Sequence, residues 1–598
     1  MQHLSNIPTV IDPWTQEWAD LLSLSIKDLF QLEDFTNVSL LEQFTNTPNI
    51  QSGHLAFPCF QLAKKVSQNP AQLAKNLKIA CETKLQSKHS LFIKEFIAAG
   101  PYLNVVWNFS SLVNVWFQKL NEKTYFHQLY SRSRPPKCML EYSQPNTHKE
   151  MHVGHMRNVC LGNSVVKLLR YCGMEVISST YPGDVGTHVA KCLWYIHRFK
   201  SVAPKENLGA WLGSMYSKAH NLLEEERNTP SEETNRIELT NILNQIHRKD
   251  GPYYEEWLQT RIWSIELMKE VYLWLGVDFD YWYFESDVDE SSMKLVDQYL
   301  AQGLFKLDQG AVGMDLSEEN LGFVLLKKTD GHGLYATKDL ELARKKFEDL
   351  KIEKSLYLVD VRQSLHFKQV FKVLEKMGFP QAKDCVHLPY EMVDLPSGPM
   401  SSRKGNIVPI QELMHEMQKS IIQEYLSQYQ KEWTSEQINL TAQQVANGAI
   451  KYGMCRVDPQ KKIIFDLKEW LRLDGNSGPY LQYTATRLNS ILNRNAFLPN
   501  GPQSFSGLGL NIAEQDLLVK LLNFHSIVWM AGQKMAVHLV ANYLFELSQT
   551  VNTFYVQSPI LNEPDAQKRQ DRLMIVWIAQ KVLAKGLALL GIECPEKM

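Results

Sequence analysis

The chain lacks the cysteine patterns that build zinc sites and disulfide frameworks. Its nine cysteines are scattered over 598 residues, and no two form a C-x-x-C pair. Structural zinc and disulfides are therefore poorly supported, and a reducing compartment fits best. No apolar run approaches the roughly 18 residues that a membrane helix needs, and the opening MQHLSNIPTVIDPW has no basic region followed by an apolar one. We predict a cytoplasmic protein with no membrane partner.

The chain also has no excess of either charge. Its 63 basic and 65 acidic residues give a net charge of −2, which argues against a protein that coats nucleic acid with a uniformly basic surface. A local basic channel is still compatible with this balance. The length is too great for one hydrophobic core, so we expect three or four domains.

The first 132 residues alternate helical patterns with short apolar runs such as YLNVVWNF, which predicts a small α+β domain. The segment SRSRPPK then interrupts the pattern, because prolines favour extended linkers. A strand CMLEYS, a helix HVGHMRNVCLGNSVVKLLRYCG and a second strand MEVISSTY follow. This βαβ order opens a parallel sheet and indicates a nucleotide-binding α/β fold.

The second half of that fold lies far downstream. SLYLV at 355–359 predicts a strand, and SLHFKQVFKVLEKMG predicts an amphipathic helix with Leu365, Val370 and Leu374 on one face. The region between, about 195–290, is helical and contains the charge run EEERNTPSEETNR, so we expect a helical insertion with a solvated loop. From 411 onward the pattern is helical and shows no strand pairs.

These patterns predict an α/β fold of three parts. A Rossmann-type parallel-sheet domain at 133–410 carries the helical insertion. An N-terminal α+β domain precedes it at 1–132, and a C-terminal all-α bundle follows at 411–598.

The segment NTHKEMHVGHMRN holds three histidines, His148, His152 and His155. Their spacing is compatible with a metal cluster, but no carboxylate or cysteine stands nearby at ligand spacing. They could also be polar residues at a helix start with no function. The third interpretation places H-x-G-H where the first strand leads into a helix N-terminus, whose amides and dipole favour phosphate. There Gly154 leaves room for a nucleotide, and His152 and His155 donate to phosphate oxygens.

A second motif, GPMSSRKGN at 398–406, lies in the other half of the same fold. Its glycines and serines predict a mobile loop, and Arg403 and Lys404 supply cations for a triphosphate. Alone it would be compatible with an ordinary basic surface loop. The two motifs in this order, separated by an insertion and followed by a helical bundle, are more specific than either one.

HVGH and MSSRKG resemble the two signature sequences of class I aminoacyl-tRNA synthetases. Further segments resemble the arginyl-tRNA synthetase family in order and approximate spacing, from residue 139 to the end: EYSQPNTHKEMHVGHMRN, YPGDVGTH, GLYATKDL, DVRQSLHFKQV, GNSGPYLQYTATRL and GLALLGIECPEKM. The N-terminal domain resembles that family's additional tRNA-contacting domain, and the bundle its anticodon-binding domain.

The resemblance implies an arginine–tRNA ligase. L-arginine attacks the α-phosphate of ATP, with Mg²⁺ assisting, and the arginyl group of the adenylate then passes to the 3′ end of tRNA(Arg). The family usually needs bound tRNA before it activates arginine, and its default state is a monomer.

The resemblance also implies site residues. Those for catalysis are His152, His155, Lys149, Arg403 and Lys404. Those for arginine are Glu141, Tyr335 and Asp339 at the guanidinium and Asn146, Gln363 and Ser143, or Gln144, at the amino and carboxylate groups. Those for ATP are Gly154, His155, His366, Met400 and Ser401. Those for tRNA are Tyr480, Tyr483, Arg487 and Met598, with Phe554 and Tyr555 as further parts of the surface.

A guanidinium with five donors and a permanent charge needs carboxylates and an aromatic face, which agrees with the guanidinium set. The alternative for Tyr335 to Asp339 is an ordinary helix start, because Thr337 and Asp339 are good capping residues. The chain departs from the family pattern at Gln144, His148, Val185, His188, Lys338 and Ser402. Ser402 stands where the general class I loop has a lysine, so Lys149, Arg403 and Lys404 all stay open as its replacement.

Three rival functions are compatible with parts of the pattern. A small-molecule nucleotidyltransferase also uses H-x-G-H but has no need of the helical C-terminus. A catalytically silent relative that binds tRNA would be expected to lose the histidines or the loop. A class I synthetase for another amino acid would leave the guanidinium set unexplained.

Overall fold

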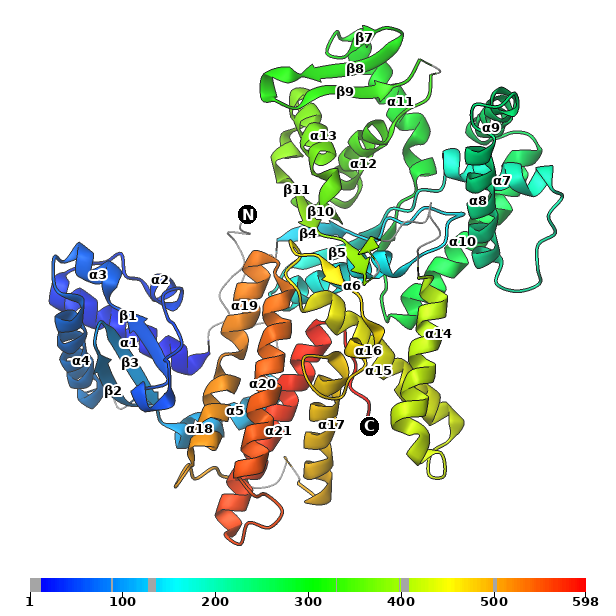
Figure 1. The fold of residues 1–598 in the computed structure, drawn as a ribbon. Helices are drawn as coiled ribbons and strands as arrows, with labels where there is room; N and C mark the ends of the chain where they lie inside the picture. Colours follow the sequence, from blue (N-terminus) through cyan, green and yellow to red (C-terminus); the bar gives the residue numbers. More distant parts are fainter. Residues whose placement is uncertain are drawn as a thin grey trace.

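The computed structural model divides into three parts that follow the chain (Figure 1). It describes residues 12–87, 90–126, 136–329, 331–396, 398–399, 408–497, 499 and 503–598. The N-terminal domain lies to one side, a mixed α/β region occupies the upper half of the view, and a long helical bundle extends below it. No helix in the described part of the chain combines the length and apolarity that crossing a membrane requires.

An antiparallel sheet in the order β1-β3-β2 forms the centre of the N-terminal domain. Its elements are α1 (Pro13–Phe30), α2 (Asn37–Leu41), β1 (Leu55–Pro58), α3 (Phe60–Lys65), α4 (Pro70–Ser87), β2 (Ile93–Ala99), β3 (Tyr102–Trp107) and α5 (Phe109–Asn121). Trp14 and Trp18 of α1 are buried, and Trp14 packs against Trp116 of α5. The predicted α+β domain is confirmed.

A five-stranded parallel sheet in the order β11-β10-β4-β5-β6 forms the centre of the molecule. Its strands are β4 (Lys137–Glu141), β5 (Glu175–Thr180), β6 (Tyr281–Trp282), β10 (Lys354–Asp360) and β11 (Cys385–Tyr390). From β4 the chain runs outward in one direction to β5 and β6 and later returns to β10 and β11 on the other side. The point where this order reverses lies between β4 and β10, which is where open α/β sheets bind ligands.

Helix α6 (Val153–Tyr171) joins β4 to β5 and is buried on nearly all sides, because it packs against both the sheet and the bundle. Gly162 makes its close packing possible. A Cβ there would lie 2.2 Å from the ring of Tyr142, so a larger residue would separate α6 from the turn after β4. The predicted βαβ unit is confirmed with its boundaries moved by one or two residues.

The insertion forms a helical lobe at one side of the sheet (Figure 1). Its helices are α7 (Thr187–Arg198), α8 (Leu208–Glu225), α9 (Ser231–Arg248) and α10 (Pro252–Trp274). The prediction that 195–290 is all helical is wrong at its end, because β6 at Tyr281–Trp282 belongs to the central sheet. Two residues are too few for a strand pattern to be recognised.

A second lobe follows β6. It comprises α11 (Glu285–Ala301), a small antiparallel sheet of β7 (Lys306–Asp308), β8 (Ala311–Leu316) and β9 (Gly322–Lys327), then α12 (Tyr335–Leu350) and α13 (Ser364–Lys376). The strand and helix predicted from SLYLV and SLHFKQVFKVLEKMG are confirmed as β10 and α13. Leu365 is wrongly placed by the prediction, since it is 55% exposed while Val370 and Leu374 are buried.

The C-terminal part is a bundle of α14 (Ile410–Ile421), α15 (Ser435–Cys455), α16 (Leu467–Trp470), α17 (Gly478–Arg494), α18 (Ile512–Leu522), α19 (Phe524–Lys534), α20 (Val537–Gln557) and α21 (Ala566–Leu589). No two described strands of this region pair with each other, as predicted, but one short strand joins it to the preceding domain. Ile463–Ile464 forms β14, which pairs in parallel with β12 (Val393–Leu395), while β13 (Gly398–Pro399) pairs with the other edge of β12. This small sheet connects the bundle to the domain that contains the five-stranded parallel sheet.

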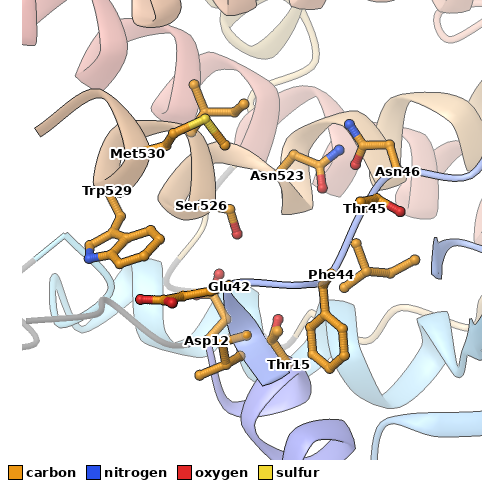
Figure 2. Close-up of a pocket in the computed structure, with 13 residues that line it drawn as sticks. Asp12, Thr15, Glu42, Phe44, Thr45, Asn46, Asn523, Ser526, Trp529 and Met530 are labelled. Carbon is orange, nitrogen blue, oxygen red and sulfur yellow. The ribbon is translucent and has the colours of Figure 1, made fainter. Parts of the chain in front are cut away.

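The N-terminal domain contacts the bundle at α19, and a cavity of about 310 Å³ lies in the junction. Figure 2 shows Thr15 and Phe44 of the N-terminal domain on one side and Ser526 and Met530 of α19 on the other. Beside it, His525 Nδ1 and Asp12 Oδ1, both buried, lie 2.9 Å apart in a hydrogen bond. A buried hydrogen bond fixes the relative position of two surfaces, because separating its partners leaves buried polar groups unsatisfied.

Candidate active site

The first motif lies at the carboxyl end of β4, where the order of the sheet reverses. Residues 142–152 form the turn from β4 into α6, and His152 is the N-cap of that helix. The side chain of His152 accepts a hydrogen bond from the Gly154 amide at 3.1 Å, and the side chain of His155 accepts one from the His152 amide at 3.1 Å. The two histidines thus form a reciprocal capping box.

This capping box fixes the tautomers of both rings. In each bond the acceptor is Nδ1, so the proton of the neutral ring is carried by Nε2. The Nε2 atoms of His152 and His155 have no hydrogen-bond partner among the described residues. The rings lie 4.0 Å apart between centroids, so the site holds two adjacent N–H donors.

Burial keeps both rings neutral. It lowers the pKa of His152 to about 4. For His155, burial and then the neighbouring His152 lower the pKa well below its ordinary value. Near pH 7 both side chains therefore donate hydrogen bonds without carrying a charge.

The backbone at the start of α6 corrects one expectation. The amide of Val153 donates to the carbonyl of Val408 at 3.1 Å, Gly154 donates to His152, and the amide of His155 donates to the carbonyl of His152 at 2.8 Å. These first amides are already satisfied, so the donors that this turn offers to a phosphate are the histidine rings rather than the backbone.

Both described flanks of the second motif are held by hydrogen bonds, and those at its C-terminal end join it to the first motif. On one side, Gly398–Pro399 pairs with β12. On the other, Val408 accepts from Val153, and the amide of Ile410 donates to the carbonyl of Met151 at 3.1 Å. The segment 400–407, with Met400, Ser401, Ser402, Arg403 and Lys404, lies outside the described residues. Its C-terminal flank lies beside HVGH, whereas its N-terminal flank pairs with β12.

His148 is separated from the other two histidines. Its ring is fully buried, with Nδ1 2.9 Å from the Thr147 hydroxyl and Nε2 2.8 Å from the Thr260 hydroxyl of α10. Burial lowers its pKa to about 3. In the described ranges, no group of three His, Cys, Asp or Glu side chains is arranged to hold a metal ion. His148 joins the turn to the insertion, and the metal interpretation of the three histidines is not supported.

Lys149 points toward the insertion, with Nζ 4.9 Å from the centre of the Tyr216 ring of α8. This contact places the Lys149 ammonium against the insertion, on the turn that leads to the capping box.

Glu141 ends β4 and is buried. One of its carboxylate oxygens, Oε2, accepts from Lys346 of α12, and the other, Oε1, accepts from Gln144 at 3.3 Å. The Lys346 side chain is fully buried, and its Nζ lies 4.2 Å from the centre of the Tyr357 ring. The sequence analysis missed Lys346, although it lies on the same apolar face of α12 as Leu342.

The remaining guanidinium candidates start α12. Asp339 Oδ2 lies 2.6 Å from His366 Nε2 of α13, which brings two predicted site residues together. Burial opposes protonation of His366, but the hydrogen bond and charge of Asp339 outweigh it, so the pKa of His366 is raised. Tyr335 is 63% exposed, and Gln363 on the turn before α13 is also exposed.

The segment does begin a helix, as the alternative interpretation predicts, but neither Thr337 nor Asp339 caps it. The N-cap of α12 is Leu334, and no side chain caps the helix. Thr337 donates instead to the carbonyl of Leu326, and Asp339 bonds His366. The carboxylate of Asp339 is therefore not used by the helix that carries it.

Asn146 lies against the turn after β5, in a bridge with Gly183. A Cβ at Gly183 would lie 2.4 Å from Asn146 Oδ1 and 3.1 Å from Glu285 Oε1, so these two side chains converge there. Glu285 is a buried acid that the sequence analysis missed. Lys338 lies 3.1 Å from its Oε2, and burial, only partly offset by Lys338, raises its pKa to about 7.

Ser143 has a left-handed backbone, with φ of 59°, and its hydroxyl bonds the Tyr272 hydroxyl at 2.7 Å. Two departures from the family pattern are accommodated in the core. Val185 packs in the core of the insertion lobe, and His188 donates from Nε2 to the Gly183 carbonyl at 3.0 Å. His188 thus supports the same turn that holds Asn146.

The predicted tRNA residues lie along α17. Tyr480 is partly buried, its hydroxyl accepting from Asn552 at 2.7 Å, whereas Tyr483 is exposed. The Arg487 guanidinium lies 3.8 Å from the centre of the Tyr555 ring. Phe554 is a correction, because it is 1% exposed and belongs to the bundle core. Met598 is partly buried against the same core.

Comparison with known proteins agrees with this geometry. Three family models match the chain: arginyl tRNA synthetase N terminal domain at residues 16–107, tRNA synthetases class I (R), catalytic domain at 118–467, and DALR anticodon binding domain at 481–598. Arginine–tRNA ligase of Bdellovibrio bacteriovorus is 47% identical over 97% of each chain, and that of Treponema denticola is 32% identical over 92% of this chain and 94% of its own.

Among solved structures, Thermus thermophilus arginyl-tRNA synthetase matches with a TM-score of 0.79 at 25% identity, covering 98% of this chain and 100% of that one. The parallel sheet and the HVGH turn at its switch point define a class I aminoacyl-tRNA synthetase, an enzyme class that uses ATP as a substrate. The chain belongs to the arginyl-tRNA synthetase family. The predicted fold class, enzyme class and family are confirmed.

Proposed function

We propose that the chain activates L-arginine with ATP to give arginyl-adenylate and pyrophosphate, and then transfers the arginyl group to the 3′ end of tRNA(Arg). The observation that carries this proposal is the pair of neutral Nε2–H donors of His152 and His155 at the sheet edge that also holds Glu141. No covalent nucleophile is needed, since the arginine carboxylate itself attacks the α-phosphate. The chain supplies position and charge stabilisation.

At the α-phosphate, His152 and His155 donate from Nε2 to the oxygens on which charge develops, and Gly154 leaves room beside the rings. Lys149 turns from Tyr216 toward the β- and γ-phosphates. Arg403 and Lys404 act there from the second motif, whose C-terminal flank lies beside HVGH. His366, Met400 and Ser401 complete the proposed ATP contacts.

Mg²⁺ would enter with ATP. The described residues hold no ready group of three ligands, which agrees with an ion bound mainly by phosphate oxygens and water. Such an ion neutralises phosphate charge, and no step proposed for these residues passes through it.

Arginine binds with its guanidinium between Asp339 and Glu141, beside the exposed ring of Tyr335. Asn146 and Gln363 bind the amino and carboxylate groups. We add Glu285 to this set because it converges with Asn146 at Gly183. Ser143 holds the turn through Tyr272, and in this role it supports the site.

The anticodon of tRNA(Arg) contacts the exposed side of α17. Tyr483 offers a ring for stacking, and Arg487, held flat on Tyr555, offers a guanidinium plane and a charge. Tyr480 and Met598 support this surface from partly buried positions. We further propose that the enzyme works as a monomer.

ATP–pyrophosphate exchange tests the proposal. The purified protein should exchange with arginine plus tRNA(Arg), and lysine, citrulline and cysteine should give no signal above background. Asp339→Ala should lose the exchange. Absence of exchange under every condition, combined with tight tRNA binding, would replace the proposal with a catalytically silent tRNA-binding relative.

A further inference from the structure

The three acids of the proposed arginine site differ in the residue that pairs with each of them. Glu141 is paired with Lys346, whose side chain is fully buried. Glu285 is paired with Lys338 at 3.1 Å. Asp339 is paired with a histidine, His366, at 2.6 Å. The partner in the first two pairs is a lysine, whereas the partner of Asp339 is a histidine, a side chain whose ordinary pKa lies much closer to neutrality.

The buried surroundings of the Lys346 ammonium keep it paired with Glu141. The ammonium contacts Glu141 at the end of β4 and lies over the Tyr357 ring of β10, so residues of two strands surround it. A charge removed from water in this way is stable only with its counter-ion in place. The net charge of the Glu141–Lys346 pair is zero before any ligand arrives.

Asp339 and Lys346 lie seven residues apart and therefore on the same side of α12, about 10 Å apart along its axis. Helix α12 thus presents an acid at its N-terminal end and a cation two turns deeper. Glu141 contacts the cation, Lys346, through Oε2, and its Oε1 accepts a hydrogen bond from Gln144. A guanidinium that lies between the two acids meets Glu141, which Lys346 already neutralises, and Asp339, whose partner His366 can lose its proton.

We propose that Lys346 is a positioning and specificity residue of the arginine site: it neutralises and orients Glu141, which then serves as a hydrogen-bond acceptor, while Asp339 supplies the charge that selects a cation. This inference rests on the proposed binding of arginine at these acids. It separates two carboxylates to which the family resemblance gives one role, and it assigns a function to a lysine outside the predicted site.

The test is a double-mutant cycle at Glu141 and Lys346. Its readout is how strongly each variant prefers a charged ligand over an uncharged one of the same shape. Citrulline has the shape of arginine but carries no charge, so the ratio of its Kd to that of arginine, from isothermal titration calorimetry, reports recognition of charge. Glu141→Gln leaves Lys346 unpaired beside the guanidinium, and removing one partner of such a pair should lower the ratio about 100-fold. Glu141→Gln with Lys346→Met removes both charges and should restore the ratio to within about fivefold of the parent.

Three further variants keep the result interpretable. Lys346→Arg retains the charge and should keep the parent ratio. Lys345→Met, the same substitution one position away, should change neither Kd. Asp339→Asn should bring the ratio close to one. If Glu141→Gln does not fold, Lys346→Met alone carries the test: its ratio should exceed that of Lys346→Arg, because two uncompensated acids then face the ligand.

The outcomes separate the inference from the function on which it rests. A parent protein that binds neither ligand contradicts the proposed function. A parent that prefers arginine, with a double variant no better than Glu141→Gln, overturns the role of Lys346. That role is also overturned if every variant loses both ligands equally, since a lysine needed only for folding would change both Kd values and leave their ratio unchanged.

Discussion

At the scale of single residues, the two nitrogens of each signature histidine, His152 and His155, have different roles. Their Nδ1 atoms cap α6, and this leaves Nε2–H as the donor that each ring offers to the site. The sequence pattern predicted the histidines but not this division, because the choice of ring nitrogen depends on backbone amides brought close only by the fold.

His152→Asn separates the two functions. Asparagine is a preferred N-cap residue, so the free energy of unfolding should change by less than about 0.5 kcal/mol. The lost donor should lower kcat of adenylate formation by roughly 100- to 1000-fold. Pyrophosphate exchange and chemical denaturation measure the two effects. His152→Ala, as the control, should lose the cap as well, at about 1 kcal/mol; equal stability of the two variants would contradict the capping role.

The Asp339–His366 pair predicts a pH dependence of arginine binding. Protonated His366 competes with the guanidinium for Asp339, and the pKa of His366 is raised above 6.5. Arginine should therefore bind more tightly as the pH rises from about 6.5 through the raised pKa, by at most about tenfold per unit. Calorimetry between pH 6 and 9 measures this change, with proton release on binding. His366→Gln should remove the slope, and an unchanged slope in that variant would refute the competition.

The same pair has the opposite effect on the free protein. Because the folded pKa of His366 is raised, the stability that the pair contributes is complete below about pH 6.5. It is lost as the pH rises through the raised value. Arginine affinity and the stability of the unliganded protein should thus change in opposite directions over this interval.

At the scale of elements, the sequence predicted those with a regular apolar pattern. β4, α6, β5, β10 and α13 were all found, because their patterns run over five residues or more. Leu365 was misplaced because five residues turn a helix by about 140°, which puts it away from Val370. β6 and β14 have two residues each. Only their pairing with distant strands defines them, so no local sequence pattern could predict them.

Arg157, on α6 just after HVGH, joins that helix to the small sheet. It is fully buried, and its guanidinium donates to the carbonyls of Met392, Asp458, Pro459 and Lys461. Met392 precedes β12, and Lys461 lies just before β14. One side chain therefore fixes the loop that joins α15 to β14, and the strand that leads to the second motif, against the catalytic helix.

Arg157→Met should break this junction. It leaves several carbonyls without their donor, so the free energy of unfolding should fall by about 3 kcal/mol. The KM for ATP should rise more than the KM for arginine, because β12 and β13 carry the second motif. Arg170→Met, at the far end of the same helix, is the matched control. Equal changes in both KM values would contradict the link to the nucleotide side.

A substitution on the exposed side of α17 should weaken tRNA binding without lowering the stability of the fold. Tyr483 is 38% exposed, so Tyr483→Ala removes little packing. If its ring stacks on an anticodon base, the KM for tRNA should rise by roughly 10-fold, with kcat and Tm nearly unchanged. Leu481→Ala on the buried side of the helix should instead lower Tm. An unaltered KM for tRNA in the Tyr483 variant would remove this residue from the interface.

At the scale of the whole molecule, α6 is the element that all three parts share. HVGH begins it, Arg157 attaches it to the small sheet, and at its other end the Tyr171 hydroxyl lies 2.9 Å from His525 of α19. His525 also pairs with Asp12 just before α1. A continuous set of buried contacts thus joins the active site, the bundle and the N-terminal domain. Sequence patterns predicted three domains, but contacts between residues hundreds of positions apart required the structure.

The most direct test of the account is charging of tRNA(Arg) with labelled arginine and ATP by the purified full-length chain. The account predicts acid-precipitable arginyl-tRNA with the parent protein and a loss of at least about 100-fold with His152→Asn, while tRNA affinity stays unchanged. No charging by the parent, or full charging by the variant, would contradict the assignment of catalysis to the HVGH donors.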